Sequence, residues 1–197
     1  MKLGEFEFET SEYVYNPSDD TFLLIDNLTI NKDDKVLEIG TGSGLIAMHA
    51  SKIVKTVIAT DISYDALCLA DKNFKANNIQ NITLKFGNLF EPVKNEKFDV
   101  ILFNTPYLPT SSDEVLEDNL NYAFDGGVDG RKIIDPFLNQ VKNHLNHGGK
   151  VQLVQSSLSG NEKTILKLNE LGFKSEITAH ERFFFEEIVV ITGVLEK

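Results

Sequence analysis

The chain has 197 residues, of which 42% are hydrophobic and 25% are charged, and its formal net charge is −11. This length predicts a single domain, residues 1–197, with a core large enough to fold without covalent staples. The acidic balance argues against a binding mode dominated by neutralised phosphates, so a nucleic-acid partner is not expected. It favours instead a basic partner, or a ligand whose reactive centre is cationic.

Cys68 is the single cysteine, which excludes an internal disulfide framework and fits a reducing compartment. It lies in an apolar helical pattern, so we expect a buried structural thiol. The opening stretch MKLGEFEFET is too polar for a secretory signal, and no apolar run approaches the ~20 residues of a membrane span. We therefore expect a cytoplasmic protein with no membrane partner.

Apolar β-branched runs alternate with helical patterns along most of the chain. Ahead of them, residues 1–28 are expected to form a loop and then a helix that begins near Ser18. The pattern predicts strands over residues 35–40, 56–61, 81–88, 98–104 and 150–157, and helices over residues 45–53, 64–76, 131–145 and 162–171. Two extended runs within residues 173–195 indicate an antiparallel hairpin. This order indicates an α/β fold with a mostly parallel sheet, closed at one edge by that hairpin.

A glycine-rich stretch, LEIGTGSG, follows the first of these strands and opens a helix. Gly40, Gly42 and Gly44 let the backbone turn tightly and approach a ligand closely. The second strand ends at Asp61, where a carboxylate can accept both hydroxyls of a ribose. The pattern is typical of a nucleoside site at the carboxyl edge of a doubly wound sheet.

The glycine spacing and Glu38 distinguish between nucleosides. A dinucleotide site has the spacing G-x-G-x-x-G, whereas this chain has G-x-G-x-G. A carboxylate at Glu38 would repel a pyrophosphate but would tolerate S-adenosylmethionine, which carries a sulfonium and an amino group. Two other interpretations stay open: a dinucleotide site, and a plain glycine turn with a solvated Asp61.

With these features the chain resembles the class I S-adenosylmethionine-dependent methyltransferases. The resemblance implies a Rossmann-like, doubly wound sheet of seven strands whose last strand is antiparallel. It also implies contacts to the cofactor from Ile62, which follows Asp61, and from Asn88 and Leu89 after the third strand. Asn88 can alternatively be a turn residue only.

The stretch FNTPYLP places an amide, a proline and an aromatic ring at the end of the fourth strand. In this fold, that strand ends opposite the methyl group to be transferred. The side-chain oxygen of Asn104 and the carbonyl of Thr105 can hold both N–H bonds of a planar acceptor. Pro106 restricts the backbone there, and Tyr107 offers a flat face for stacking. The alternative is a rigid loop with a partly buried tyrosine.

This corner resembles the Asn/Asp-Pro-Pro-Tyr motif of amino-methyltransferases, which act on adenine or cytosine amines or on the glutamine amide of translation release factors. The second class is the HemK family. Residues 15–24, YNPSDDTFLL, resemble the N-terminal signature of its short archaeal and eukaryotic branch, which implies that Thr21 lies near the cofactor and that residues 1–28 cover its site. Residues 124–135 resemble that family's loop after the corner, in which Arg131 would orient the peptide. The alternative for this loop is a turn with Asp129 as a helix N-cap.

Thr105 departs from the motif, because it replaces the first proline. The backbone carbonyl survives the change, but the constraint on φ does not, so we expect a retained site that is less preorganised.

The resulting prediction is an enzyme that methylates the glutamine of the GGQ motif in a peptide chain release factor. The alternatives are an adenine-amine methyltransferase acting on DNA or RNA, a protein lysine methyltransferase, and a non-catalytic cofactor-binding subunit. The branch also implies a small zinc-binding activator that adds to a sheet edge, and the alternating strand Ile82 to Phe86 is the candidate edge. The four histidines show no ligand spacing, so no metal is expected in this chain.

Overall fold

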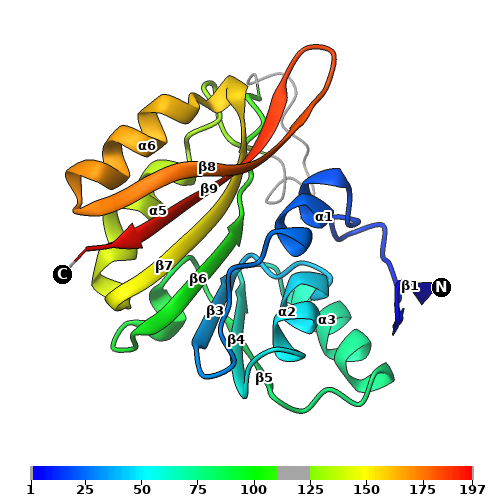
Figure 1. Cartoon of the computed structure of the whole chain (residues 1–197). Coiled ribbons are helices and arrows are strands. Elements are labelled where there is room, and N and C mark those ends of the chain that lie inside the picture. Colours follow the sequence, from blue (N-terminus) through cyan, green and yellow to red (C-terminus); the bar gives the residue numbers. More distant parts are fainter. Residues whose placement is uncertain (1, 111–124, 197) are drawn as a thin grey trace.

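The computed structural model describes residues 2–110 and 125–196. Met1 and Phe124, which belong to the predicted segments 1–28 and 124–135, lie outside the described residues, and so does Lys197. Within the described part, a sheet of seven strands forms the centre of the molecule, in the order β5-β4-β3-β6-β7-β9-β8 (Figure 1). Its strands are β3 (Lys35–Ile39), β4 (Thr56–Asp61), β5 (Ile82–Phe86), β6 (Phe98–Asn104), β7 (Leu145–Ser156), β8 (Phe173–Arg182) and β9 (Glu187–Leu195).

The strand directions agree with the predicted fold. The pairs β3–β4, β3–β6, β4–β5 and β6–β7 are parallel, while β9 is antiparallel to both β7 and β8. The described residues thus confirm a mostly parallel, seven-stranded sheet with a C-terminal antiparallel hairpin. Chain order reverses between β3 and β6, and in such sheets the crevice at this reversal is where ligands bind.

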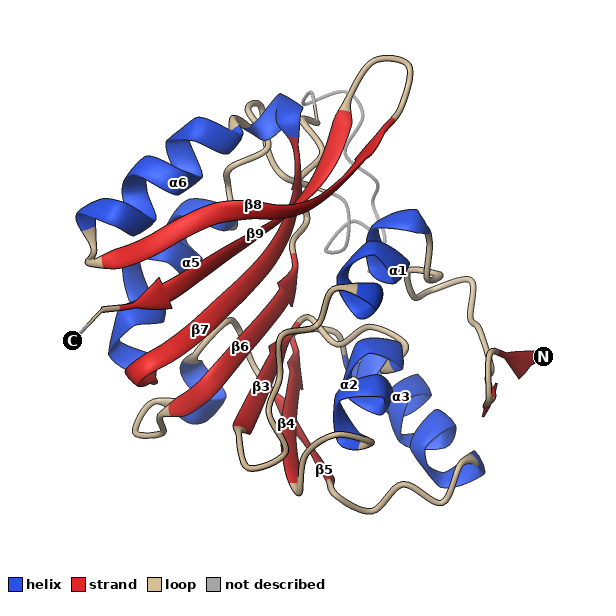
Figure 2. Cartoon of the chain, viewed as in Figure 1, coloured by secondary structure: helices blue, strands red, loops and turns tan. Residues whose placement is uncertain are grey.

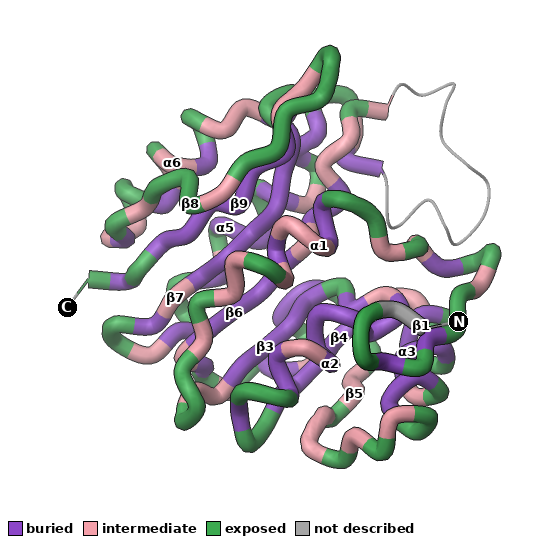
Figure 3. The backbone as a smooth tube through the Cα atoms, turned by 45° about the vertical axis from the view of Figure 1, so that its right-hand side comes forward, coloured by how far each residue is buried: buried purple, intermediate pink, exposed green. Residues whose placement is uncertain are grey.

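Helices cover both faces of the sheet (Figure 2). One face packs against α1 (Asp19–Asp26), α2 (Leu45–Ser51) and α3 (Tyr64–Ala76), and the other against α5 (Ile134–Val141) and α6 (Asn161–Glu170). Strand β3 shows how the sequence divides these layers. Val36 packs into the first core, which lies between the sheet and α1, α2 and α3. Leu37 and Ile39 pack into the second core, on the side of α5 and α6, because successive side chains point to opposite faces. All three are buried, as are most of the central strands in Figure 3.

The region around residue 145 differs most from the sequence prediction. The expected helix 131–145 is shorter, because α5 ends at Val141 and a 3-10 turn, η2 (Lys142–His144), follows it. Strand β7 begins at Leu145 rather than at residue 150, and its register with β6 shifts between Phe98 and Val100. The stretch LNHGG carries two glycines and polar residues, so it has no strand pattern. Pairing with neighbouring strands overrides the weak local preference there.

Two smaller differences lie on the surface. Cys68 is exposed on α3, so the expectation of a buried thiol is wrong. The buried face of that helix is set by residues such as Ala66, Ala70 and Phe74, and position 68 points away from it. Near the N-terminus, the strands β1 (Lys2–Leu3) and β2 (Phe6–Glu7) form a short antiparallel pair that was not predicted, because two-residue strands leave no periodic signal.

Candidate functional site

A cavity opens at the carboxyl ends of β3, β4 and β6, beneath the N-terminal segment that leads into α1. Its walls come from six parts of the chain that are far apart in sequence. The residues lining it are Tyr13, Val14, Tyr15, Pro17, Asp20, Thr21, residues 39–43, Leu45, Ile46, residues 60–63, Ala66, residues 87–89, residues 103–108 and Ile133. Most of the predicted cofactor and acceptor residues are among them; Glu38 and Gly44 are not.

The glycine-rich loop forms one wall. Gly40 and Gly42 have φ values of +65° and +55°, and a Cβ atom at Gly42 would meet no heavy atom within 4 Å. The backbone is therefore open to a ligand at this position, although a side chain would be strained there. Gly44 has another purpose, because a Cβ on it would lie 2.5 Å from the ring of Phe74. It allows α2 and α3 to pack closely and does not reach the cavity.

Asp61 ends β4 and holds the loop in place. Its Oδ2 accepts a hydrogen bond from the Gly42 N–H at 2.9 Å, and its Oδ1 accepts one from the Ser63 N–H at 2.8 Å. Burial raises the pKa of this carboxyl, and the hydrogen bonds oppose that shift. The carboxylate still has acceptor capacity for a ligand hydroxyl. Ile62 stands beside it with 40% of its surface exposed, as a flat apolar wall.

The turn after β5 forms the far end of this half of the cavity. Asn88 is exposed, while Leu89 is buried and has a φ of +45°, a conformation rare for a leucine. The turn is tied to the second strand through the Gly87 N–H, which donates to the Asp61 carbonyl at 3.0 Å. Asn88 and Asp61 both line this half of the cavity.

Glu38 lies beneath the loop and not in the cavity wall. Only 1% of its surface is exposed, and its Oε2 accepts the Thr41 hydroxyl at 2.7 Å, while Oε1 has no partner. Burial raises the pKa of this carboxyl to about 8, and the nearby Asp61 adds to the rise. The carboxyl therefore supports the loop through Thr41, and any effect on a bound ligand is electrostatic.

The chemistry of the lining fits S-adenosylmethionine. No lysine, arginine or histidine lines the cavity among the described residues, whereas Asp20 and Asp61 do. A pyrophosphate would find no cationic partner here, so the dinucleotide alternative loses its support. The open backbone at Gly42, the Asp61 carboxylate and the acidic lining suit a nucleoside with a cationic tail.

The acceptor corner occupies the other half of the cavity. The Nδ2 of Asn104 donates to Asp20 Oδ2 at 3.1 Å and to Thr21 Oγ1 at 3.3 Å. Its Oδ1 is buried and has no hydrogen-bond partner. A buried amide oxygen without a partner is costly unless something completes it. The amide is thus oriented with one acceptor that no donor in the described part of the chain uses.

Thr105 constrains the corner in a way that the sequence did not predict. The side chain is buried, and its Oγ1 donates to the Val154 carbonyl on β7 at 2.7 Å. The Thr105 N–H donates to the same carbonyl at 3.4 Å. A proline could make neither bond. The φ restriction is absent, as expected, but the threonine ties the corner to the neighbouring strand instead.

Asp20 is the acidic residue of the cavity lining that the sequence analysis missed. It is only 6% exposed, and besides Asn104 it accepts the hydroxyls of Tyr15 at 2.9 Å and Tyr107 at 3.3 Å. Burial and the nearby Asp20 raise the pKa of both tyrosines well above the usual range, so both stay neutral. Asp20 precedes Asn104 by 84 residues, and only the folded chain brings them together.

The loop after the corner packs against its backbone. A Cβ on Gly126 would lie 2.9 Å from the Pro106 carbonyl, and one on Gly130 would lie 2.4 Å from the Tyr107 carbonyl. Only glycine allows this approach. The Tyr107 carbonyl also accepts the hydroxyl of Ser159 at 2.7 Å, from the 3-10 turn η3 (Ser157–Ser159). The loop and η3 together hold the corner from outside.

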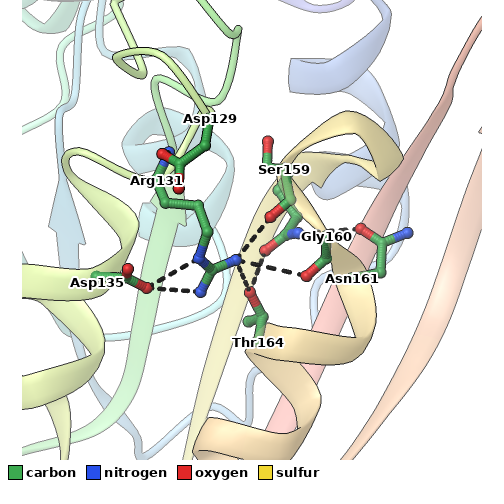
Figure 4. A network of polar contacts seen from close by, with 8 residues as sticks. Asp129, Arg131, Asp135, Ser159, Gly160, Asn161 and Thr164 are labelled. Carbon is green, nitrogen blue, oxygen red and sulfur yellow. Dashed lines mark hydrogen bonds and ion pairs between the residues drawn. The ribbon is translucent and has the colours of Figure 1, made fainter.

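Arg131 does not face the cavity, so its predicted role in orienting a peptide is wrong. Its guanidinium is buried and donates to Asp135, to the Ser159 carbonyl and to the Thr164 hydroxyl (Figure 4). The alternative of an N-cap is also wrong, because α5 begins at Ile134 and Asp129 Oδ1 accepts the Arg131 N–H instead. Arg131 joins the loop to α6 and supports the turn that carries Ser159.

Comparison with known proteins identifies the family of this chain. The family model described as "Methyltransferase small domain" matches residues 16–184. The chain belongs to this family. The expected methyltransferase activity and the use of S-adenosylmethionine are confirmed by this membership and by the relatives below.

Two relatives of the chain are named as glutamine methyltransferases. A provisionally named protein N5-glutamine methyltransferase of Methanocaldococcus jannaschii is 51% identical over 181 residues, which are 91% of each chain. A release factor glutamine methyltransferase of Geobacter sulfurreducens is 29% identical over 201 residues, covering 95% of this chain and 70% of that protein. The resemblance to release factor glutamine methyltransferases is thereby confirmed.

Among solved structures, a chain of the E. cuniculi Mtq2–Trm112 complex superimposes on this methyltransferase with a TM-score of 0.70. The match covers 93% of this chain and 99% of that one at 24% identity, so it shows the shared fold. That complex is described as responsible for methylating the translation termination factor eRF1.

Within residues 2–110 and 125–196, no helix is both long and apolar enough to cross a membrane. Within the same residues, no three His, Cys, Asp or Glu side chains gather closely enough to hold a metal ion.

Proposed function

We propose that this methyltransferase transfers a methyl group from S-adenosylmethionine to the side-chain amide nitrogen of the glutamine in the GGQ motif of a peptide chain release factor. The observation that carries the proposal is at Asn104, which lines the cavity and whose buried Oδ1 has no hydrogen-bond partner among the described residues. This oxygen can accept a hydrogen bond from an N–H of the substrate. The relatives named for glutamine methylation support this choice of acceptor, and a translation factor as substrate fits the expected cytoplasmic location.

The two halves of the cavity have different proposed roles: one binds the cofactor and the other binds the acceptor. In the proposal, Asp61 accepts the ribose hydroxyls, and Ile62, Asn88 and Leu89 surround the adenine. Gly40 and Gly42 let the cofactor approach the backbone, and Thr21 contacts its amino acid end. Glu38 and Gly44 support the loop from behind. The N-terminal segment, residues 1–28, covers this site as part of the one domain.

The chemistry needs positioning more than acid–base catalysis. When bound, the cofactor supplies an electrophilic methyl group on a sulfonium. An amide nitrogen is a poor nucleophile, because its lone pair is delocalised into the carbonyl. In the proposal, Asn104 Oδ1 accepts one N–H of the acceptor and the Thr105 carbonyl accepts the other, which directs the nitrogen towards the methyl group. Pro106 restrains that carbonyl and Tyr107 supports the planar amide.

The proton needs no dedicated base. Once the nitrogen has gained its methyl group it is cationic and strongly acidic, so it can release the proton to water. This agrees with the cavity lining, in which no histidine or lysine is found among the described residues.

Mass spectrometry of the acceptor tests the proposal. The chain, the cofactor and a purified class 1 release factor are incubated, and the GGQ peptide is expected to gain one methyl group on its glutamine. Asn104→Ala should abolish the transfer, whereas the exposed Asn95→Ala is the matched control and should not. Parallel samples contain duplex DNA, RNA or a lysine-rich protein. Methylation of one of these, with an unmodified release factor, would contradict the proposal, and so would cofactor binding without any transfer.

The sheet edge at β5 is the proposed site for a small activator protein, which we expect to bind zinc. Strand β5 is the outermost strand on its side, and Phe86 on it is 62% exposed. Ile82 and Leu84 are half-buried and pack against the first core, so charging them would also disturb the fold. Phe86→Glu is therefore the sharper test. It should weaken co-purification of the activator, whereas Tyr64→Glu, at a 71% exposed aromatic on α3, should not.

A further inference from the structure

Asp20 lies between the N-terminal segment and the acceptor corner, and its carboxylate divides its two oxygens between them. Oδ1 accepts the Thr21 N–H at 2.6 Å, the Thr21 hydroxyl at 3.1 Å and the Tyr15 hydroxyl at 2.9 Å. Oδ2 accepts the Asn104 Nδ2 at 3.1 Å and the Tyr107 hydroxyl at 3.3 Å. Every partner of this buried carboxylate can donate.

This arrangement decides which way the Asn104 amide points. An asparagine side chain has a donor end and an acceptor end of nearly the same shape, and it can turn over. A carboxylate only accepts, so the NH2 end of Asn104 must face Asp20 Oδ2. The oxygen end then points away from Asp20, and Oδ1 is left without a partner within residues 2–110 and 125–196. Because Asn104 lines the cavity, a bound ligand is the group that can complete it.

We propose that Asp20 is a positioning residue for methyl transfer, which holds the Asn104 amide in the one orientation that accepts an N–H from the substrate. In the opposite orientation Asn104 would present its NH2 group to the acceptor nitrogen, and two donors would face each other. Asp20 acts through Asn104 and needs no contact with the reacting atoms. The inference rests on the proposed function, because it assumes a planar NH2 acceptor.

The substitution Asp20→Asn tests this role with almost no change of shape. The new amide has one oxygen, and the Thr21 backbone N–H, which cannot turn round, takes it. The amide NH2 then faces Asn104, which must turn over to accept from it. We expect kcat to fall by about 100-fold, the scale of a misplaced reacting group, with no change in the affinity for S-adenosylhomocysteine. Asp19→Asn removes the same charge from the same helix turn, and as an exposed neighbour it should leave kcat unchanged.

The reciprocal exchange gives a readout that a merely structural role would not move. Asn104→Asp alone places two carboxylates against each other and should lose most of the activity. In the double variant Asp20→Asn/Asn104→Asp, the new amide donates to the new carboxylate, whose second oxygen again faces the acceptor. The double variant should therefore be more active than either single variant. Because it reports on the pair, it also serves if Asp20→Asn alone is too unstable to assay.

Three results would overturn the inference: wild-type kcat in Asp20→Asn, a double variant no better than the single ones, or an equal loss of cofactor affinity in both variants that carry Asn at position 20. The last would mean that Asp20 binds the cofactor itself. Failure of the proposed function is distinguishable, because the wild-type chain would then leave the release factor unmodified. The activities of the single and double variants would in that case be measured on whichever acceptor is methylated.

Discussion

At the scale of single residues, Thr105 is the position where this chain departs from the motif it resembles. Its buried hydroxyl donates to the Val154 carbonyl, so Thr105→Val should remove that bond while keeping the shape. We expect a loss of about 1 kcal/mol in the free energy of unfolding and a lower kcat, because the corner is no longer tied to β7. Denaturant titration and steady-state kinetics measure the two effects. Thr105→Ser keeps the hydroxyl and should retain both, and equal behaviour of the Val and Ser variants would show that the bond is unimportant.

The buried carboxyl of Glu38 should make stability depend on pH in the cofactor-free protein. Its pKa is raised to about 8 in the folded chain, above the usual value of 4.5. The folded state therefore holds the proton more tightly than the unfolded state. The stabilising contribution is complete below pH ~4.5 and is lost as the pH rises through ~8.

Glu38→Gln should remove this dependence. Denaturant midpoints between pH 5 and pH 9 should fall less steeply in the Gln variant, which should become the more stable chain at the alkaline end. The difference between the two chains isolates Glu38 from Asp61, whose pKa is also raised. Parallel curves for the two chains would show that Glu38 does not titrate in this range.

The sequence predicted the site residues that end strands. Asp61 and Asn104 were identified because parallel strands bring their carboxyl ends to one edge, and both line the cavity. Asp20 was missed because its acidic neighbourhood looks like an ordinary helix start, and its partners come 84 and 87 residues later. Arg131 was misassigned because a charge in a glycine-rich loop gives no sign of being buried.

At the scale of elements, the glycine loop after the corner acts as a clamp on the Tyr107 carbonyl. Gly130 has a φ of +72°, and a Cβ there would collide with that carbonyl. Gly148 has a similar φ of +76° but open space around it, so it is a matched control. Backbone strain should cost both alanine variants about 1–2 kcal/mol, and the collision should cost Gly130→Ala more. Only Gly130→Ala should also lower kcat, as measured on protein kept folded; an equal kcat in both would contradict the clamp.

Element types were predicted better than element ends. The alternation of strands and helices follows from β-branched runs and helical spacing, and the structure confirms it. The early start of β7 at Leu145 and the pairing of β1 with β2 depend on partners elsewhere in the chain. Local pattern carries no record of such partners.

At the scale of the whole molecule, the cavity joins segments that share no local sequence. Its walls include residues 13–21 ahead of the sheet, the loop at residues 40–43 and the turn at residues 87–89. A ligand that fills the cofactor half would contact all three at once. Binding should then slow their opening together, because a bound ligand stabilises the closed state by mass action.

Hydrogen–deuterium exchange with and without S-adenosylhomocysteine measures this coupling. We expect slower exchange in peptides covering residues 13–21, 40–46 and 86–90, which lie in three separate parts of the chain. Peptides from residues 174–182 on β8, at the opposite edge of the sheet from β5, should exchange at the same rate in both samples. Protection limited to residues 40–46 and 86–90 would mean that the N-terminal segment does not cover the cofactor, because only a covering segment is held closed by the ligand beneath it.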